Sequence, residues 1–574
     1  MDRRLSLSSL QASGAISPVD VHLTNLAARL TNESRPDVQL AMALASQWPQ
    51  RGHVCVDLAK LVPDDLWESQ EIAPDEQDVV MPQTANWIAS LKDSKAIGSP
   101  GDQTPFVLWK DRWLYLRRHW TYENEISIRL RSWLMRGQSS TPGPLHEDKQ
   151  EQAVQLAAAH PFFILTGGPG TGKTTTVLRI LGHLLSLHPE LRIALAAPTG
   201  KAALRLQESI AAGVAALEVN DAIATALLTQ AHTLHRLLGY QRHQTTFKHH
   251  ADNPLPYDLV IVDEASMMDL GLFAKLLRAL KPNTRLLLVG DREQLPSVDA
   301  GAVFKALCSE HSPLPRVELT RNYRFAQDTG IGALAVAIRN GDADLTELLL
   351  ADDQDTSCTQ EPLPSASQMR DALWQRLGAY LRTLANCPEP DQAFEKLDEL
   401  RILCAHRRGP YGTETINEYV RDILATRMGQ SRVQRWYPGR PILITENDYA
   451  VELFNGDTGI LLPWNGKLHA FFRTGDGNYR RIPPARLPAH ESAYAMTVHK
   501  SQGSEFTDVL LVLSDQASRL LTRELLYTGV TRARNTVSIW GPISSVRASV
   551  ERPLQRTSGL AAWFKTVKLI PKES

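Results

Sequence analysis

The stretch GGPGTGKT, Gly167–Thr174, matches the pattern G-x-x-x-x-G-K-[ST] and decides how the rest of the chain is interpreted. It follows the apolar run FFIL and precedes the helical pattern TTVLRILGHLL. Glycines let main-chain N–H groups approach a phosphate, and the N-terminus of the following helix adds partial positive charge. The stretch therefore predicts a phosphate-binding loop, with Lys173 at the β- and γ-phosphates and Thr174 at a Mg²⁺ ion.

A glutamine precedes this loop, and a pair of carboxylates follows a later apolar run. The stretch LHEDKQEQAV places Gln150 where its amide would recognise the adenine edge, and in YDLVIVDEAS the pair Asp263 and Glu264 follows LVIV. We expect Asp263 to hold Mg²⁺ through water and Glu264 to orient and deprotonate the attacking water. Together these residues predict an ATPase. The expected metal ligands are Thr174 and Asp263, and the expected nucleotide contacts are Gln150, Gly167, Gly168, Pro169, Gly170, Thr171, Gly172, Lys173, Thr174 and Thr175.

The composition is that of a globular protein with several domains. The chain has 574 residues, which is too many for a single core. Charged residues make up 22% and hydrophobic residues 43%, as in ordinary globular proteins. Lys plus Arg is 62 and Asp plus Glu is 63, so any surface for nucleic acid must be local. The five cysteines include no CxxC pair, which supports neither a disulfide framework nor a zinc site. Without a secretory signal or a membrane-spanning run, we expect a cytoplasmic protein with no membrane contact.

From about residue 149, short apolar runs alternate with helical patterns. The runs FFILTG, LRIALAAPTG, YDLVIVDEAS and TRLLLVGD each end in a polar loop, as the buried strands of a parallel sheet do. A second series contains RILCAHRRG, DVLLVLSD and TVSIWGP. Inside it, GRPILITENDYAVELFNGDTGILLPWNGKLHAFF has short strands broken by Asn-Gly and Asn-Asp turns, which predicts a small inserted β-barrel or hairpin module over about 430–490.

These patterns predict an α/β fold in three parts. Residues 1–125 form a mixed α/β N-terminal domain, residues 126–345 hold the P-loop and the carboxylate pair, and residues 346–574 hold the second sheet and its insertion. The first block and its edge contain seven of the twelve tryptophans, which pack either as core or as a docking surface for a partner. We interpret Arg136–Asp148 as a linker and Leu350–Gln368 as a surface excursion.

Several other stretches place polar residues beyond strands. They are APTGKAA (Ala197–Ala203), TLHRLLG (Thr233–Gly239), LLLVGDREQLPSVDAG (Leu286–Gly301), LTRNYRF (Leu319–Phe325), YAMTVHKSQGSEF (Tyr494–Phe506) and LLYTGVTRARN (Leu525–Asn535). In this order the set resembles the superfamily 1 helicases. The spellings VDEASMMDL, GDREQLPSVDAG, LFNGDTG, AMTVHKSQGSEF and LYTGVTRAR are similar to the RecD branch, the alpha subunit of exodeoxyribonuclease V, as is the tryptophan-rich first block with GHVCVDL.

The resemblance implies two RecA-like P-loop NTPase domains, the second with an SH3-like β-barrel insertion. It implies an arginine finger that reaches across the cleft, with Arg532 as the first candidate and Arg324 as the second, and Gln294 as a sensor of the γ-phosphate. The cofactors would be ATP and Mg²⁺. The expected contacts to the backbone of single-stranded DNA are Thr199 and Lys201 on one lobe, and Thr497, His499 and Ser501 on the other.

The resemblance also implies a place in a larger assembly. We expect a 5′-to-3′ motor subunit of a RecBCD-type helicase–nuclease that acts on double-stranded DNA ends, with RecB-like and RecC-like partners. The nuclease would reside in another subunit, because we find no compact Asp/Glu/Lys nuclease signature here. One alternative is a free-standing helicase, which would be monomeric and active alone. Another is a regulatory or scaffold subunit with an idle ATP site, which the intact Lys173, Glu264 and Arg532 disfavour.

Overall fold

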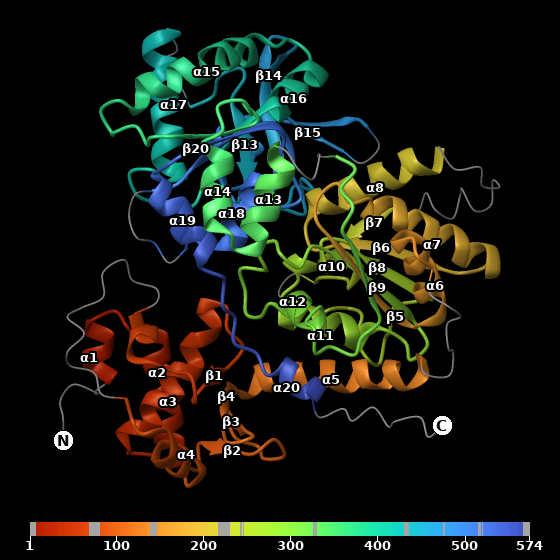
Figure 1. Cartoon of the computed structure of the whole chain (residues 1–574), viewed down its shortest axis with the longest axis vertical. Helices are drawn as coiled ribbons and strands as arrows, with labels where there is room; N and C mark the ends of the chain where they lie inside the picture. Colours follow the sequence, from red (N-terminus) through yellow and green to blue (C-terminus); the bar gives the residue numbers. More distant parts are fainter. Residues whose placement is uncertain are drawn as a thin grey trace.

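The computed structural model describes residues 7–67, 81–137, 146–215, 230–241, 244, 246–324, 330–429, 435–474, 477–514, 518 and 520–565. Figure 1 shows an N-terminal domain (red) beside two larger lobes. The first lobe is built on a six-stranded sheet and the second lobe on a five-stranded sheet. A further antiparallel sheet extends from the second lobe, and we call it the β-module.

The first lobe is a parallel sheet with the strand order β10-β5-β9-β8-β6-β7. Its apolar runs are buried on both faces because helices cover each side. The strands are β5 (Phe162–Gly167), β6 (Ile193–Ala197), β7 (Ala231–Thr233), β8 (Leu259–Val262), β9 (Arg285–Gly290) and β10 (Arg316–Leu319). One face packs on α6 (Lys149–Ala159), α7 (Lys173–Leu187) and α8 (Gly200–Ala215), and the other on α5 (Arg117–Gly137), α10 (Leu234–Leu237), α11 (Leu270–Ala279) and α12 (Val303–Leu307).

The second lobe is also a parallel sheet, with the order β11-β20-β19-β12-β18. Its strands are β11 (Cys358–Glu361), β12 (Leu400–Cys404), β18 (Ala495–Thr497), β19 (Phe506–Val512) and β20 (Ala533–Trp540). Helices α13 (Gly330–Asn340), α14 (Ala343–Leu350), α18 (Arg523–Val530) and α19 (Ile543–Glu551) cover one face, and α15 (Met369–Asn386), α16 (Pro390–Glu399) and α17 (Thr413–Arg427) the other. The interpretation of Leu350–Gln368 as a surface excursion was wrong, because this stretch contains the edge strand β11.

The β-module interrupts the second lobe between α17 and β18. Its order is β16-β15-β14-β13-β17, with strands β13 (Pro441–Ile444), β14 (Thr458–Trp464), β15 (Lys467–Arg473), β16 (Tyr479–Ile482) and β17 (His490–Ser492). All of these neighbours pair in the antiparallel direction. In the described part of the chain β16 and β17 are the two edges, so the SH3-like closure into a barrel stays a prediction.

The N-terminal domain combines a four-stranded sheet with a helical layer. Its strands are β1 (Val56–Asp57), β2 (Ile97–Gly98), β3 (Phe106–Trp109) and β4 (Trp113–Leu116), and its helices include α1 (Leu7–Ala12), α2 (Pro18–Thr31), α3 (Pro36–Gln47) and α4 (Thr84–Lys92). Most of its tryptophans are core residues, as the first of our two interpretations predicted; the buried ones, counted together with Trp133 of α5, are Trp48, Trp87, Trp109, Trp120 and Trp133.

Two expected domain boundaries fall inside helices. Residue 125 lies within α5, which packs along the first lobe and stacks Trp133 on Phe162 with ring centroids 5.2 Å apart. Residue 345 lies within α14, and α13 before it already packs on the second lobe. The middle of the expected linker at Arg136–Asp148, residues 138–145, lies outside the described residues.

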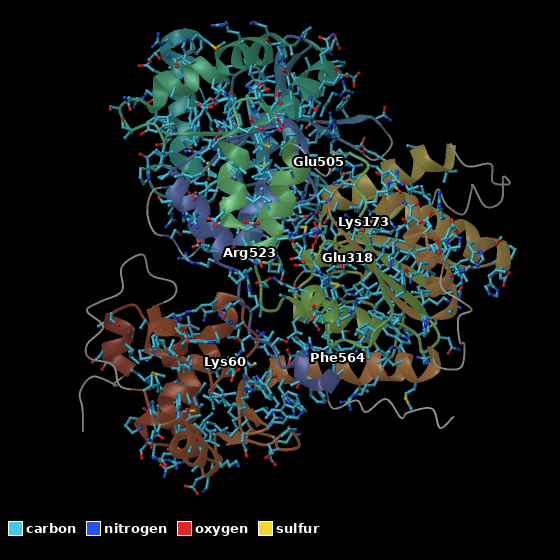
Figure 2. The ribbon with its side chains drawn as sticks, viewed as in Figure 1. Lys60, Lys173, Glu318, Glu505, Arg523 and Phe564 are labelled. Atoms are coloured by element: carbon cyan, nitrogen blue, oxygen red, sulfur yellow. The ribbon has the colours of Figure 1, made fainter. Side chains whose placement is uncertain are left out.

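The end of the chain does not stay with the second lobe, as the expected boundary 346–574 implied. After α19, residues 552–565, which we call the C-terminal strap, run back to the first lobe (blue in Figure 1) and end in α20 (Leu560–Lys565). Leu560 and Phe564 are buried in the core that contains β5, and Trp563 stacks on Trp109 at 4.7 Å. The strap therefore completes a core that is otherwise built from the first half of the chain. Figure 2 labels Phe564 beside α5.

Helix α2 carries an exposed apolar stripe on the surface of the N-terminal domain. Val19, Leu26 and Leu30 are 69%, 45% and 76% exposed, and their spacing places them on one helical face. All five cysteines are buried free thiols. Within the described ranges, no helix combines the length and the apolar character needed to cross a bilayer.

Candidate active site between the two lobes

The predicted phosphate-binding loop joins β5 to α7 and is held in a fixed shape. Gly170 and Gly172 have φ values of +75° and +82°, which favour glycine. The Lys173 ammonium donates to the carbonyl oxygens of Gly167 at 2.8 Å and Gly168 at 2.9 Å. The main-chain N–H groups at the start of α7 face the same region. This geometry is that of an anion site.

A cavity of about 360 Å³ lies between this loop and the second lobe. The predicted site residues that line it are Pro169, Gly170, Thr171, Gly172, Lys173, Thr174, Thr175, Asp263, Glu264, Gln294, Arg324 and Arg532. Three residues that were not predicted as site residues also line the cavity: Arg205, Tyr323 and Glu505. Tyr323 and Glu505 were quoted within motifs, but nothing in the spelling of α8 distinguished Arg205 from a surface arginine.

The acidic residues meet at the carboxyl ends of β8 and β9. Burial raises the pKa of Asp263 to about 6, and the neighbouring charge of Glu264 adds to this effect. Glu264 adopts a left-handed φ of +50°, an uncommon conformation for a residue other than glycine that is often associated with function. Asp291 follows β9 and is 2% exposed, and it accepts a hydrogen bond from the Gln294 amide at 3.2 Å. Burial also raises the pKa of Asp291, which Lys173 partly offsets.

The carboxylate of Asp263 and the hydroxyl of Thr174 fit the expected Mg²⁺ site. Thr174 and Asp263 line the same cavity. Burial of the Asp263 carboxyl group disfavours its charged form and so raises its pKa. A buried carboxylate next to another one favours a cation. In the described residues there is no cluster of three His, Cys, Asp or Glu side chains that would form an all-protein metal site. A site with one carboxylate, one hydroxyl and waters is the arrangement that Mg²⁺ uses beside phosphates.

Two arginines reach the cavity from outside the phosphate-binding loop. Arg532, just after α18, is 2% exposed and donates to the carbonyls of Thr528 at 3.2 Å and Ser504 at 3.1 Å. Burial lowers the pKa of Arg532, and the charges of Glu264 and Glu505 oppose this effect. Its guanidinium is therefore fixed beside the carboxylates.

Arg324 is not part of the phosphate-binding loop but packs directly against it. The N–H of Tyr323 donates to the Gly170 carbonyl at 2.9 Å, and a Cβ at Gly170 would lie 2.6 Å from the Cβ of Arg324. Only glycine fits at position 170 against this segment. Arg324 forms an ion pair with Glu505 of the second lobe at 2.7 Å, and Arg205 of the first lobe pairs with the same carboxylate at 2.5 Å.

Glu505 is thus the acidic centre of an arginine cluster between the lobes. Burial alone would raise its pKa, but Arg205 and Arg324 outweigh burial and lower the pKa to about 2. Figure 2 labels Glu505 close to Lys173 at the junction of the two lobes. Because the first lobe supplies Arg205 and the second supplies Glu505, this cluster joins the lobes across the cavity.

A separate corner of the site suits a flat ring. The amide nitrogen of Gln150 would lie 2.8 Å from a Cβ at Gly172, and the Tyr323 ring approaches the same position at 3.6 Å. Gln150 is buried, whereas Tyr323 is 59% exposed. A buried amide beside an exposed aromatic face is an arrangement that can bind adenine by hydrogen bonding and stacking. Gln150 therefore lies beside the phosphate-binding loop, its contact with adenine stays a prediction, and Tyr323 is an additional candidate.

Direct hydrogen bonds connect the nucleotide side of the first lobe to the second lobe. Tyr527 of α18 donates to Asp291 at 3.1 Å. The N–H of Leu295 donates to the Thr528 hydroxyl at 2.9 Å, and the Gln502 amide donates to the Leu295 carbonyl at 2.6 Å. Gln294, expected to sense the γ-phosphate, immediately precedes Leu295, which makes two of these contacts with the second lobe.

The predicted DNA contacts divide into two groups. Thr199, Thr497 and His499 are half-buried at the carboxyl ends of β6 and β18, or just beyond them. Ser501, in contrast, is fully buried and donates to the Val498 carbonyl at 2.7 Å, so the expectation that it contacts DNA is wrong for this conformation. Its position in a short 3-10 helix, His499–Ser501, turns it inward.

Lys201 is also placed differently from the prediction. Its side chain enters a cavity between α8, the β-module and the second lobe, with the ammonium 5.8 Å from the ring centroid of Phe506. Burial lowers the pKa of Lys201 to about 8, and Asp398 counteracts this effect. Lys201 therefore contributes to a contact between lobes rather than to an open groove.

Two basic residues that sequence analysis left unassigned follow β12. Arg407 and Arg408 are exposed, and β12 pairs with β18, so they lie next to Thr497 at the same sheet edge. Arg407 forms an ion pair with Glu414 at 3.0 Å. Their position beyond the stretch RILCA, where parallel strands place functional loops, was the signal that could have identified them.

The first lobe carries the phosphate-binding loop, and the second lobe lies against the same cavity. This arrangement defines a two-lobed P-loop NTPase with the architecture of the superfamily 1 helicases. Family models match at "RecBCD enzyme subunit RecD, N-terminal domain" (residues 12–115), "AAA domain" (150–300) and "UvrD-like helicase C-terminal domain" (492–539). The chain belongs to the RecD family, since the RecBCD enzyme subunit RecD of Mycolicibacterium smegmatis is 39% identical over 96% of this chain and 98% of its own length.

Other relatives match a smaller share of this chain. The RecBCD enzyme subunit RecD of Haemophilus influenzae is 36% identical over 72% of each chain. The ATP-dependent RecD2 DNA helicase of Deinococcus radiodurans is 34% identical over 72% of this chain but only 51% of its own length. Among solved structures, a Bacteroides Pif1 bound to single-stranded DNA is similar with a TM-score of 0.40 and 17% identity, over 70% of this chain and 94% of that one.

Proposed function

We propose that this chain is the ATP-driven motor subunit of a RecBCD-type helicase–nuclease and moves along single-stranded DNA in the 5′-to-3′ direction. One observation carries the proposal. Lys173, Glu264 and Arg532, from a phosphate loop, a strand end and the opposite lobe, line a single cavity. An ATP site that does not hydrolyse would not require this combination, because each of these residues serves hydrolysis rather than binding alone.

The chemistry follows from the positions of these side chains. The phosphate-binding loop and Lys173 hold the β- and γ-phosphates, and Glu264 accepts the proton of the attacking water. Thr174 and Asp263 would hold Mg²⁺, which when bound neutralises phosphate charge. Arg532 stabilises the negative charge that develops on the transferred group, an effect worth roughly 10³ to 10⁵ in rate. Arg324 is the second contributor of positive charge.

ATP favours contact between the lobes because its phosphates add partners that bridge them. Glu505 serves as an anion for Arg205 and Arg324. A γ-phosphate competes for these arginines, and hydrolysis removes that competitor. The interlobe contacts of Tyr527 and Leu295 are then free to rearrange, since ligands shift such equilibria only through differential contacts.

The track would run over the carboxyl ends of both sheets. Thr199 on the first lobe and Thr497 and His499 on the second are positioned for phosphate contacts. Arg407 and Arg408 add positive charge at the edge of the second sheet. Such a surface is sequence-tolerant and salt-dependent.

The proposed partners are RecB-like and RecC-like subunits, bound through the N-terminal domain in the bacterial cytoplasm at double-stranded DNA ends. The stripe Val19, Leu26 and Leu30 supports a docking role for that domain. The free-standing alternative is less favoured, because similarity to the M. smegmatis RecD subunit extends over 96% of this chain, whereas similarity to the RecD2 helicase extends over 72% of it.

The test is ATP hydrolysis by the purified chain with and without oligo-dT. We expect stimulation by DNA, weaker stimulation as salt rises, and loss of hydrolysis in Lys173→Gln. Lys92→Gln, an exposed lysine paired with Asp111 on the N-terminal domain, is the matched control and is expected to be unchanged. Hydrolysis that ignores DNA would reject the track, and an inactive native chain would favour the scaffold alternative.

A further inference from the structure

Two tyrosines from distant parts of the chain stack on each other between the first lobe and the β-module. Tyr240 follows α10 in the first lobe, and Tyr449 lies in the loop between β13 and β14. Their ring centroids are 5.4 Å apart and the rings are inclined by only 13°. Although stacked, the two side chains remain 44% and 45% exposed. Each ring therefore keeps surface available to another flat group.

The loop that carries Tyr449 rests on the start of α8. A Cβ at Gly200 would lie 3.3 Å from the Asp457 carboxylate and 3.9 Å from the Phe454 side chain. Phe454 in turn contacts Tyr449 edge to face, with centroids 5.6 Å apart. Thr199, the proposed phosphate contact, immediately precedes Gly200. A DNA strand lying on Thr199 thus passes along the foot of the loop that carries Tyr449.

The first-lobe side of the pair is rigid and basic. Tyr240 N–H donates to the His235 carbonyl at 2.9 Å, and Gly239 has a φ of +72°, so a tight turn ends α10 and fixes the tyrosine. The His235 ring lies 6.5 Å from that of Tyr240, and Arg236 is exposed beside it. A basic surface with an exposed aromatic ring is the usual composition of a site for single-stranded nucleic acid.

Energetics favour exchange of one stacking partner for another. An aromatic pair contributes about 0.5–1.5 kcal/mol beyond its buried area, whereas stacking of a nucleobase on an aromatic side chain contributes about 1–3 kcal/mol. The two ranges overlap, so stacking on a nucleobase can replace the contact between the two rings at a similar free energy. A pair that only latched the module to the first lobe would have no reason to leave both rings half exposed.

We propose that Tyr240 and Tyr449 form a base-stacking site for single-stranded DNA, in which the two rings separate and receive a nucleobase. The inference rests on the proposed function, because it assigns a contact of the same DNA track. It also gives a role to the stretches TLHRLLG and NDYAVELFNGDTG, which the catalytic site does not use. The base is recognised by its flat face, so the site accepts any of the four bases.

The first test is equilibrium binding of fluorescein-labelled oligo-dT to the complete chain. We expect Tyr240→Ala and Tyr449→Ala each to weaken binding by about 5- to 100-fold, and Tyr→Phe at either position to stay within about 2-fold, because only the ring is needed. Trp464→Ala is the matched control. It removes a 39%-exposed aromatic of the same module at the far end of β14, and binding should not change.

The second test identifies stacking directly. An abasic site is moved one position at a time along oligo-dT, and affinity for the native chain should fall at one or two positions only. In Tyr449→Ala this dip should disappear. A native chain that binds DNA with a flat abasic profile, or a dip that persists in both alanine variants, would overturn the stacking site while leaving the motor proposal intact. A native chain that does not bind oligo-dT would instead overturn the proposed function.

Discussion

The carboxylate of Glu505 holds the guanidinium of Arg324 at 2.7 Å, and so places an anion of the second lobe where the phosphates of a nucleotide are expected. The same carboxylate holds Arg205 at 2.5 Å. Both arginines thereby line the cavity. An arginine cluster without this counter-ion would be dispersed by like-charge repulsion.

Glu505→Gln is expected to lower DNA-stimulated ATP turnover about tenfold or more, since charge-assisted hydrogen bonds of roughly 1.5–3 kcal/mol would be lost at Arg205 and Arg324. Steady-state kinetics at saturating ATP and oligo-dT measure the effect. The control is Glu399→Gln, which removes an ion pair with Lys396 elsewhere on the second lobe. Equal turnover in the two variants would show that Glu505 does not position the arginines.

Arg532→Ala is expected to retain near-normal binding of a non-hydrolysable ATP analogue while turnover falls by about 10³-fold or more, because the residue acts on charge that develops only during transfer. Analogue binding and ATP turnover are measured on the same preparation. Arg547→Ala, on α19 of the second lobe, where the guanidinium pairs with Asp344 and Glu347, should change turnover by less than about threefold. A large loss of analogue binding in Arg532→Ala would point to ground-state binding instead.

Glu123 predicts a pH dependence of stability. Burial raises its pKa to about 7, although Ser558, Tyr115 and Gly559 donate hydrogen bonds to its carboxyl group. Because the folded pKa exceeds the ordinary value of 4.5, its contribution to stability is complete below pH 4.5 and is lost as pH rises through about 7. The full shift corresponds to about 3 kcal/mol.

Glu123→Gln should therefore remove part of the decrease in the unfolding midpoint between pH 6 and pH 8.5, as measured by thermal denaturation monitored by circular dichroism. The Ser558 hydroxyl can reverse its role and accept from the new amide. Glu125→Gln, a half-buried neighbour paired with Arg278, is the control and should follow the native protein. Parallel curves for all three proteins would contradict the assignment.

The stripe on α2 predicts a specific loss of assembly. Leu26→Asp combined with Leu30→Asp should abolish co-purification with RecB-like and RecC-like subunits, because charges would enter a desolvated interface. DNA-stimulated ATPase of the isolated variant should remain within about twofold of the native chain, since the substitutions are exposed and far from the cavity. Leu348→Asp on α14, 68% exposed in the native chain, is the control for general surface effects.

Local motifs explain why so much of the catalytic site could be predicted. The phosphate loop, Asp263 and Glu264 follow strands whose apolar runs are readable, and each residue acts within a few positions of its motif. Arg532 could be predicted because its motif resembles that of the superfamily 1 helicases. Its burial and its hydrogen bonds to Thr528 and Ser504 depend on packing that no local pattern contains.

Other features depend on distant partners and were missed for that reason. Strand β11 reads CTQE, because an edge strand needs no continuous apolar run, and pairing with β20 makes it a strand. The inward direction of Lys201 results from the β-module, which begins more than two hundred residues later. The boundaries inside α5 and α14 were misjudged because these helices bridge parts of the molecule without a change in composition.

The C-terminal strap has a consequence for how this protein is made. Leu560 and Phe564 sit in the core beside Phe162, and the Thr557 carbonyl accepts from the Val54 N–H at 2.7 Å. During synthesis, domains generally fold from the N-terminus as they leave the ribosome. Here the core that contains β5 stays incomplete until the ribosome has translated past Phe564, so the first lobe waits for the second to be made. The nascent chain must keep that apolar surface from aggregating while the second lobe is translated.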